Sequence, residues 1–255
     1  MVGDPHFGMY AWKPETGANF NLKIAAKITK GAFDNLIARA PDAHTGVLIC
    51  LGDLVHADTK RAVTEASGHL LDVDSRWQRV MKVTLETFEH AIYRLLAKHE
   101  KVVARFCEGN HDPQASFNIA TSIAEHFRNE PRVTIDLCPA NYWYFSFGKT
   151  LLGATHGHKC KTAKLPSIMA AMVPKWWGRS NCRVQYQGHL HHMRTEEFNG
   201  CVVHVMQTLA PADAYAAGAG YLSGRSMALD IYHRRVGFLT RHLCPATQAE
   251  AAARK

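Results

Sequence analysis

The sequence has no stretch that approaches the roughly 20 uninterrupted apolar residues of a membrane-spanning helix. Its first residues also lack the basic region followed by an apolar region that forms a secretory signal. No two of its seven cysteines form a C-x-x-C pair, and most of them lie in or beside apolar runs. These absences argue against a membrane protein, a secreted protein and a disulfide-stabilised one. They predict a cytoplasmic protein with reduced thiols and no membrane partner.

Internal repeats and long low-complexity linkers are absent as well, so nothing divides the chain into several domains. Its 255 residues, 47% of them hydrophobic, are enough to bury one substantial core. We therefore expect a single domain over residues 1–245. An Ala-rich tail at 246–255 should be loose or form a frayed helix.

The chain is basic, with a formal net charge of +8. Such a charge attracts polyanions, because basic side chains release the counterions of a phosphate backbone and steer its approach. Nucleic acid is therefore a candidate partner. An ordinary basic surface is the alternative that the charge alone leaves open.

Apolar residues recur at helical spacing in some segments and form short compact runs in others, which predicts interleaved helices and buried strands. The expected helices cover 22–37, 77–98 and 115–128. The expected strands cover 46–51, 102–106, 133–137, 142–147, 150–155, 183–187, 201–206, 226–232 and 237–242. Helices interleaved early and strands crowded late indicate an α/β (α+β) fold with a mixed sheet or two stacked sheets and helices on the outer faces.

Polar clusters follow these apolar runs, and loops at the carboxyl ends of buried strands converge in space. The clusters offer oxygen and imidazole donors but no thiolate: Asp4, His6, Asp53, Asn110, His156, His189 and His191. Such donors suit Mn, Fe, Zn, Ni or Co rather than a structural thiolate zinc site. Two neighbouring ions need one shared ligand, and Asp53 is the candidate because a carboxylate can bridge.

The order of the clusters resembles that of the calcineurin-like metallophosphoesterase superfamily over about Gly3 to His191. The matching blocks are Gly3-Asp4-Pro5-His6, Gly52-Asp53-Leu54-Val55-His56, Gly109-Asn110-His111-Asp112, His156-Gly157-His158 and Gly188-His189-Leu190-His191. The resemblance implies a two-sheet β-sandwich flanked by helices.

The resemblance also implies a role for each residue of the blocks. Asp4, His6 and His191 would hold one divalent ion, Asn110, His156 and His189 the other, and Asp53 would bridge them. Of the candidate ions we expect Mn. The ions would lower the pKa of a shared water, giving a bridging hydroxide that attacks the phosphorus in line. His111 would stand free of the metals and protonate or stabilise the leaving oxygen.

The second block departs from the superfamily's usual G-D-x-x-D, because His56 stands where an aspartate orients the histidine of the third block. The branch of double-strand-break repair nucleases also has a histidine there. An imidazole can give a proton or contact a diester oxygen, whereas a carboxylate would repel the anion, so His56 is a candidate catalytic residue. The alternative is that His56 only hydrogen-bonds His111.

We therefore predict a dimetal phosphodiesterase that acts on nucleic acid or a nucleotide diester, and a compact chain like this one resembles the exonuclease-like enzymes of phages and prophages. Ala57 and Asp112 argue against the protein serine/threonine phosphatases, which have arginine and glutamate at these places. Cyclic-nucleotide phosphodiesterases and phosphomonoesterases stay open. A catalytically silent binding module is a further alternative, against which the complete blocks weigh. The oligomeric state also stays open.

Candidates for substrate contacts lie beside the blocks. Lys159 follows the fourth block, Arg194 follows the fifth, and Arg225 ends a loop rich in small residues. His158 is a fourth candidate, with a purely structural role as the alternative.

The first block has only Met1 and Val2 in front of Gly3, whereas the superfamily places a full apolar strand there. The interpretation that we favour is a longer natural N-terminus with a truncated first strand here. The other interpretation is an incomplete sheet edge, which would weaken metal binding at Asp4 and His6 because ordering a loose terminus costs entropy.

Overall fold

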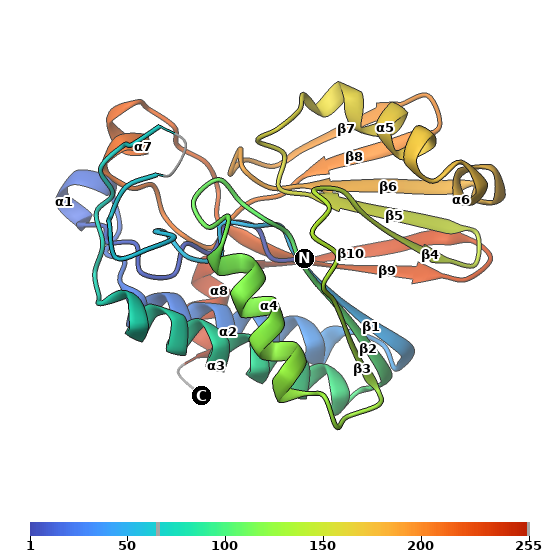
Figure 1. Cartoon of the computed structure of the whole chain (residues 1–255), viewed down its shortest axis with the longest axis horizontal. Helices are drawn as coiled ribbons and strands as arrows, with labels where there is room; N and C mark the ends of the chain where they lie inside the picture. The colour runs from blue at the N-terminus through green and yellow to red at the C-terminus, as the bar shows by residue number, and fades with distance from the viewer. Residues whose placement is uncertain (65–66, 254–255) are drawn as a thin grey trace.

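A computed structural model describes residues 1–64 and 67–253 (Figure 1). The helical segments are α1 (Lys13–Thr16), α2 (Leu22–Arg39), α3 (Trp77–Leu96), α4 (Ala115–His126), the 3-10 turn η1 (Thr162–Lys164), α5 (Leu165–Met172), α6 (Pro174–Arg179), α7 (Ala214–Gly218) and α8 (Ala246–Ala252). The strands are β1 (Ala43–Cys50), β2 (His99–Phe106), β3 (Val133–Asp136), β4 (Trp143–Phe147), β5 (Thr150–Thr155), β6 (Cys182–Gln187), β7 (Arg194–Phe198), β8 (Cys201–Val205), β9 (Ser226–His233) and β10 (Gly237–Pro245). Every helix and strand expected from the sequence is present, with ends shifted by a few residues.

Hydrogen bonds join the strands into three sheets. Strands β1, β2 and β3 form a parallel sheet in that order, and β9 pairs with β10 in an antiparallel ribbon. The third sheet is mixed and has the order β4-β5-β6-β8-β7. Helices α2, α3 and α4 cover the outer face of the β1–β3 sheet, and α5 and α6 cover the outer face of the mixed sheet (Figure 1).

Alternation of side chains along β1 explains why the sheets stack. Leu48 and Cys50 point into the core beneath α2, α3 and α4, whereas Ile49 points into the core shared with the mixed sheet. Strand β9 divides its side chains in the same way, with Met227 on the helix side and Ala228 on the sheet side, so it lies in the same layer as β1. The predicted fold class, stacked sheets flanked by helices, is confirmed.

The parallel pairings place one end of several strands at a common edge. Strands β1 and β2 run side by side in the same direction, and so do β5 and β6. The second and third sequence blocks follow β1 and β2, and the fourth and fifth follow β5 and β6. Val2 pairs in parallel with Cys50 at the end of β1, which brings the first block to the same edge.

Part of the Ala-rich segment at 246–255, for which a loose tail or a frayed helix was expected, is helical. Residues 246–252 form helix α8, in which Ala246 and Ala249 are buried. Gly31 of α2 allows this approach, because a Cβ at Gly31 would lie 2.4 Å from the backbone oxygen of Ala249. Residues 254 and 255 lie outside the described range. Within that range no helix is both long enough and apolar enough to cross a bilayer.

Candidate metal centre

The described residues include three groups of His and Asp side chains whose donor atoms all lie within 4.8 Å of one another. These groups are Asp4, His6, Asp53 and His191; Asp53, His156 and His189; and His6, His56 and His111. The first two groups share Asp53, whose Oδ2 lies 3.8 Å from Nε2 of His6 and 3.3 Å from Nε2 of His156. The structure thus brings together donors from all five loops at one edge of the stacked sheets.

The backbone at these positions is unusual. Among the described residues, the non-glycine residues with positive φ are five in number, and all are candidate ligands: Asp4, His6, Asp53, His189 and His191. Their φ values lie between 44° and 68°, in the left-handed region that side chains with a Cβ seldom adopt. Backbone strain of this kind persists where the surrounding contacts hold the residue in place, and it concentrates at functional sites. Here all five strained residues belong to the donor groups that share Asp53.

Two carboxylates tie neighbouring loops together through backbone donors. The N–H of His189 donates to Oδ1 of Asp4 at 2.8 Å, and the N–H of His111 donates to Oδ1 of Asp53 at 2.9 Å. The second contact requires a glycine at position 109, because a Cβ there would lie 2.1 Å from Oδ1 of Asp53. The glycines that open the blocks therefore let carboxylates and backbone approach closely.

Hydrogen bonds also orient the imidazole of His156. Its Nδ1 donates to the carbonyl oxygen of Leu51 at 2.7 Å, which leaves Nε2 facing the site. That Nε2 lies 2.9 Å from Oδ1 of Asn110 and 3.3 Å from Oδ2 of Asp53. Burial lowers the pKa of His156, but the adjacent Asp53 carboxylate more than compensates and raises it to about 10. Positive charge is therefore favoured between Asp53, Asn110 and His156.

The residues present fit divalent cations. Oδ2 of Asp4 is buried and has no hydrogen-bond partner among the described residues, which a buried carboxylate oxygen tolerates poorly. Nε2 of His6 lies 3.2 Å from Nε2 of His191 and 3.8 Å from Oδ2 of Asp53. Burial lowers the pKa of His6 well below its usual range, so this imidazole is neutral and has a lone pair to offer. Converging imidazoles and carboxylates are the donors that Mn, Zn or Fe accept.

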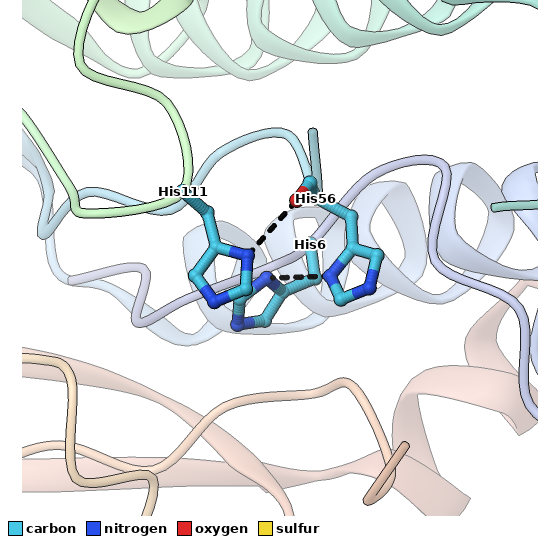
Figure 2. A group of neighbouring side chains, drawn as sticks. All are labelled: His6, His56 and His111. Atoms are coloured by element: carbon cyan, nitrogen blue, oxygen red, sulfur yellow. Dashed lines mark hydrogen bonds between the residues drawn. The ribbon is translucent and has the colours of Figure 1, made fainter. Parts of the chain in front are cut away.

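The imidazole of His56 lies against two other imidazoles of the site. Its Nδ1 lies 3.3 Å from Nδ1 of His6, while its ring stacks on that of His111 with centroids 5.2 Å apart (Figure 2). It is the backbone carbonyl of His56, not its imidazole, that accepts the hydrogen bond from Nδ1 of His111. His56 is only 1% exposed, so its ring lies behind His6 rather than open to solvent. Contact with His6 favours an orienting role over direct contact with a substrate.

Two buried aspartates, Asp112 and Asp58, hold these loops together through hydrogen bonds from backbone N–H groups. The sequence motifs predicted this role for neither of them. Asp112 accepts hydrogen bonds from the backbone N–H groups of Asp53 (3.1 Å), Leu54 (2.6 Å) and Gly109 (3.0 Å). It thereby joins the loop after β1 to the loop after β2. Asp58 accepts from the N–H groups at the start of α4. A buried carboxylate needs several hydrogen-bond donors. The sequence does not reveal which backbone groups supply them, because the donors lie on loops that become neighbours only in the folded protein.

The four candidate substrate residues are placed differently from one another. His158 is half-buried with its ring 5.2 Å from that of His156, which keeps it at the site. Lys159 donates to Glu108 at 2.7 Å and to Asn141, and Arg194 pairs with Glu196. Arg225 donates through Nε and Nη2 to the carbonyl oxygen of Leu209. Internal partners thus occupy the charged groups of Lys159, Arg194 and Arg225, and their contact with a substrate stays a prediction.

A cavity of about 360 Å³ lies beside the first and second blocks. Phe7, Gly8 and Ala57 form its inner wall, directly after His6 and His56 in the sequence. Its outer wall consists of residues from the loop after β1 and the start of α3: Thr59, Lys60, Ala62, Val73, Ser75, Arg76, Trp77, Gln78 and Val80. The cavity therefore combines the aromatic residues Phe7 and Trp77 with the basic residues Lys60 and Arg76.

The chain is similar to solved structures only at low sequence identity. No protein-family model matches the sequence, and no curated protein matches it. A single mutant of Vps29 from Entamoeba histolytica is 12% identical with a TM-score of 0.39, and the match covers 79% of this chain and 77% of that one. Wild-type Vps29 of the same organism complexed with Zn²⁺ is 13% identical (TM-score 0.32, 78% and 98% covered), and Vacuolar Protein Sorting 29 from Cryptosporidium parvum is 15% identical (TM-score 0.32, 77% and 95% covered).

Proposed function

We propose that this protein is a metal-dependent phosphodiesterase that hydrolyses nucleic acid or nucleotide diesters, with two divalent ions, most favourably Mn, as cofactors. The observation that carries the proposal is the pair of donor groups that share Asp53. In the proposed assignment Asp4, His6 and His191 hold one ion, Asn110, His156 and His189 hold the other, and Asp53 contacts both. When bound, such ions supply the Lewis acidity that activates water and neutralises a phosphoryl group.

The protein's own side chains supply orientation and proton transfer. Nδ1 of His111 is engaged by the carbonyl of His56, so its Nε2 is the nitrogen that can protonate a leaving oxygen. His56 contacts Nδ1 of His6, which leaves Nε2 of His6 pointing at Asp53 and His191. In this proposal His111 is the catalytic acid and His56 is a positioning residue.

The cavity beside the first two blocks supports a nucleotide substrate. Nε1 of Trp77 donates to the carbonyl oxygen of Asp58 at 2.9 Å, which fixes the indole at the cavity wall. A fixed aromatic face can stack on a base, and stacking is tolerant of sequence. Lys60 and Arg76 stand beside it, and both are exposed. Basic groups next to an aromatic ring suit a base with its flanking phosphate.

The first experiment tests the reaction class. Purified protein is loaded with Mn²⁺ and assayed on bis(p-nitrophenyl) phosphate, on p-nitrophenyl phosphate and on linear single- and double-stranded DNA. We expect the diester to be hydrolysed with at least tenfold higher kcat/KM than the monoester, and DNA to be degraded. Preference for the monoester would replace the proposal with a phosphomonoesterase. Stoichiometric metal binding without turnover of any substrate would indicate a binding module.

The second experiment tests the nucleotide part of the proposal. Trp77→Leu and Arg76→Gln should each lower kcat/KM for a short oligonucleotide several-fold relative to kcat/KM for bis(p-nitrophenyl) phosphate, which has no base or flanking phosphate to bind in the cavity. Matched controls are Trp176→Leu and Lys175→Gln on α6, which does not line the cavity. An unchanged ratio between the two substrates in both cavity variants would remove the support for nucleic acid and leave the diesterase proposal standing.

A further inference from the structure

The positive charge of the protein is concentrated in one segment of the chain. Residues 137–195 contain eight lysine and arginine residues and no aspartate or glutamate. The remaining residues include 22 basic and 22 acidic ones, so their formal charges cancel. The formal net charge of +8 therefore comes entirely from this segment, which forms β4, β5, η1, α5, α6, β6 and the start of β7.

The helical part of this segment lies along β6 from its carboxyl end to its amino end (Figure 1). At the carboxyl end, Oγ1 of Thr162 in η1 donates to Oε1 of Gln187 at 2.9 Å, and Gln187 directly precedes the fifth block. At the amino end, Nε and Nη2 of Arg183 donate to the carbonyl oxygen of Trp177 in α6, at 3.1 and 2.8 Å. Met169 of α5 is buried against the same sheet. Helices η1, α5 and α6 therefore lead away from the candidate metal centre.

Four basic side chains of this layer are exposed: Lys161 and Lys164 at η1, and Lys175 and Arg179 in α6. We call these four side chains the basic tract. None of them forms an ion pair with a described residue, because every ion pair of a lysine or arginine in the described chain belongs to another side chain. Lys175 and Arg179 are four residues apart in one helix, so they lie on the same face. A polyanion can thus contact the basic tract without meeting a carboxylate of the segment.

The position of the basic tract favours nucleic acid over a membrane surface. Lys161 follows the fourth block by three residues, so a phosphate chain that crosses the metal centre continues onto η1. A membrane-bound surface helix needs a broad apolar face in addition to its basic residues. In the described helices α5 and α6, the large apolar side chains that are exposed are only Met172 and Trp176. Charge without such a face is typical of a surface that follows a phosphate backbone.

We propose that the basic tract binds a nucleic-acid strand beyond the metal centre, so that the substrate is a polynucleotide and not a cyclic or mononucleotide diester. The proposal rests on the proposed diesterase function for the place of the cleaved bond, but the binding itself does not require catalysis. Lysine and arginine side chains that contact phosphates position a strand without reading its sequence. We therefore expect binding that is independent of base composition and sensitive to salt.

The length of β6 determines how long the strand must be. Its six residues span roughly 20 Å at about 3.3 Å per residue. Phosphates along one strand of a duplex are about 3.4 Å apart, so about six stacked nucleotides reach from the metal centre to α6. A trinucleotide bound at the metal centre contacts only the η1 end and does not reach Lys175. Affinity should therefore rise steeply between a trinucleotide and a strand of about 20 nucleotides.

Binding is measured by fluorescence anisotropy with labelled deoxythymidine strands in EDTA, which prevents turnover. The triple variant Lys161→Gln, Lys164→Gln, Lys175→Gln should bind a strand of about 20 nucleotides at least tenfold more weakly than wild type. Each phosphate contact contributes about 0.7 to the slope of log K against log salt for a single strand, so the slope should fall by about 2. Circular dichroism verifies that the variant is folded.

The matched control removes three charges outside the segment. Lys23 and Lys27 of α2 and Lys101 of β2 are exposed, and the triple variant Lys23→Gln, Lys27→Gln, Lys101→Gln should bind within about twofold of wild type. Acetylation of lysines followed by mass spectrometry locates the strand. The long strand should protect Lys161, Lys164 and Lys175, whereas the trinucleotide should leave Lys175 fully reactive.

Three outcomes would overturn the proposal. Equal losses of affinity in the two triple variants would show an ordinary basic surface with no defined tract. Equal affinity for the trinucleotide and the long strand would show that the strand is not held beyond the metal centre. Cosedimentation with vesicles of phosphatidylserine and phosphatidylcholine that the tract variant loses, with unchanged affinity for the long strand, would identify a membrane as the partner. A protein that binds the long strand through the tract but hydrolyses no diester would lose the proposed function and keep the strand-binding tract.

Discussion

Nδ1 of His111 lies 2.9 Å from the backbone carbonyl oxygen of His56. Because a carbonyl only accepts, Nδ1 must carry the proton, and the ring is held with Nε2 as its other functional atom. His111 of the third block is therefore oriented by a backbone carbonyl of the second block and not by a carboxylate side chain. A side-chain change at position 56 can leave this bond in place, whereas a change at position 111 removes the acid itself.

His111→Asn should lower kcat for bis(p-nitrophenyl) phosphate by about 10²- to 10⁴-fold, the range typical of a lost general acid. Metal content should remain at the wild-type value, because His111 is not among the proposed ligands. Steady-state kinetics and elemental analysis of the same sample measure the two quantities. His192→Asn is the matched control, since His192 is exposed and its Nδ1 bonds the backbone carbonyl of Leu190. A His111 variant that loses metal in proportion to activity would reassign His111 as a ligand.

Gly109→Ala should disrupt the metal centre while leaving the sheets intact. The new Cβ would lie 2.1 Å from Oδ1 and 2.2 Å from the backbone nitrogen of Asp53, so the loop after β1 must move. We expect at least tenfold weaker Mn²⁺ binding by calorimetry and a loss of about 1–3 kcal/mol of unfolding free energy from overpacking. Gly178→Ala in α6 is the control, because its Cβ would meet nothing within 4 Å. Wild-type affinity in Gly109→Ala would contradict the close approach.

The sequence predicts the helices and strands well because they follow from local patterns, whereas the metal-binding role of the donor residues stays a prediction. Apolar periodicity defines β1 and α3, and polar residues directly after strands such as Asp53 converge once parallel strands share an edge. The orientation of His56 toward His6 was not predictable, because it depends on how two loops pack across the site. Ion pairs such as Lys159–Glu108 were missed for the same reason, since their partners are about 50 residues apart.

Asp58 illustrates a contact that sequence alone does not reveal and that stability measurements can test. Its Oδ1 accepts hydrogen bonds from the backbone N–H groups of Gln114 (3.0 Å) and Ala115 (2.7 Å) at the start of α4, and it is 2% exposed. Asp58→Ala should therefore cost about 1–3 kcal/mol of unfolding free energy, because buried donors lose their acceptor. Urea denaturation measures this change. The control is Glu86→Ala, which removes a 3.8 Å surface ion pair with Lys82 and should change the unfolding free energy by less than about 0.5 kcal/mol. An equal loss of unfolding free energy in both variants would show that Asp58 does not stabilise the start of α4.

His204 on β8 should make stability depend on pH. Burial, together with the charge of Arg241, lowers the pKa of His204 to about 4, and Nη1 of Arg241 lies 3.3 Å from its Nδ1, a contact that needs a neutral acceptor. The unfolded chain takes up this proton near its usual pKa of about 6.5. The contribution of His204 to stability is thus fully present above that pH and is lost as the pH falls from about 6.5 through 4.

The pH dependence is tested by comparing His204→Gln with wild type in urea denaturation at pH 7.5 and pH 4.5. Glutamine does not titrate, so the variant should lose less unfolding free energy over this range than wild type. The difference should be on the order of 1 kcal/mol, less than the full pKa shift implies, because His204 is partly exposed and solvent screens its charge. His192→Gln, at an exposed position, should follow the wild-type curve. Parallel curves for wild type and His204→Gln would mean that the folded protein tolerates a charged His204 beside Arg241.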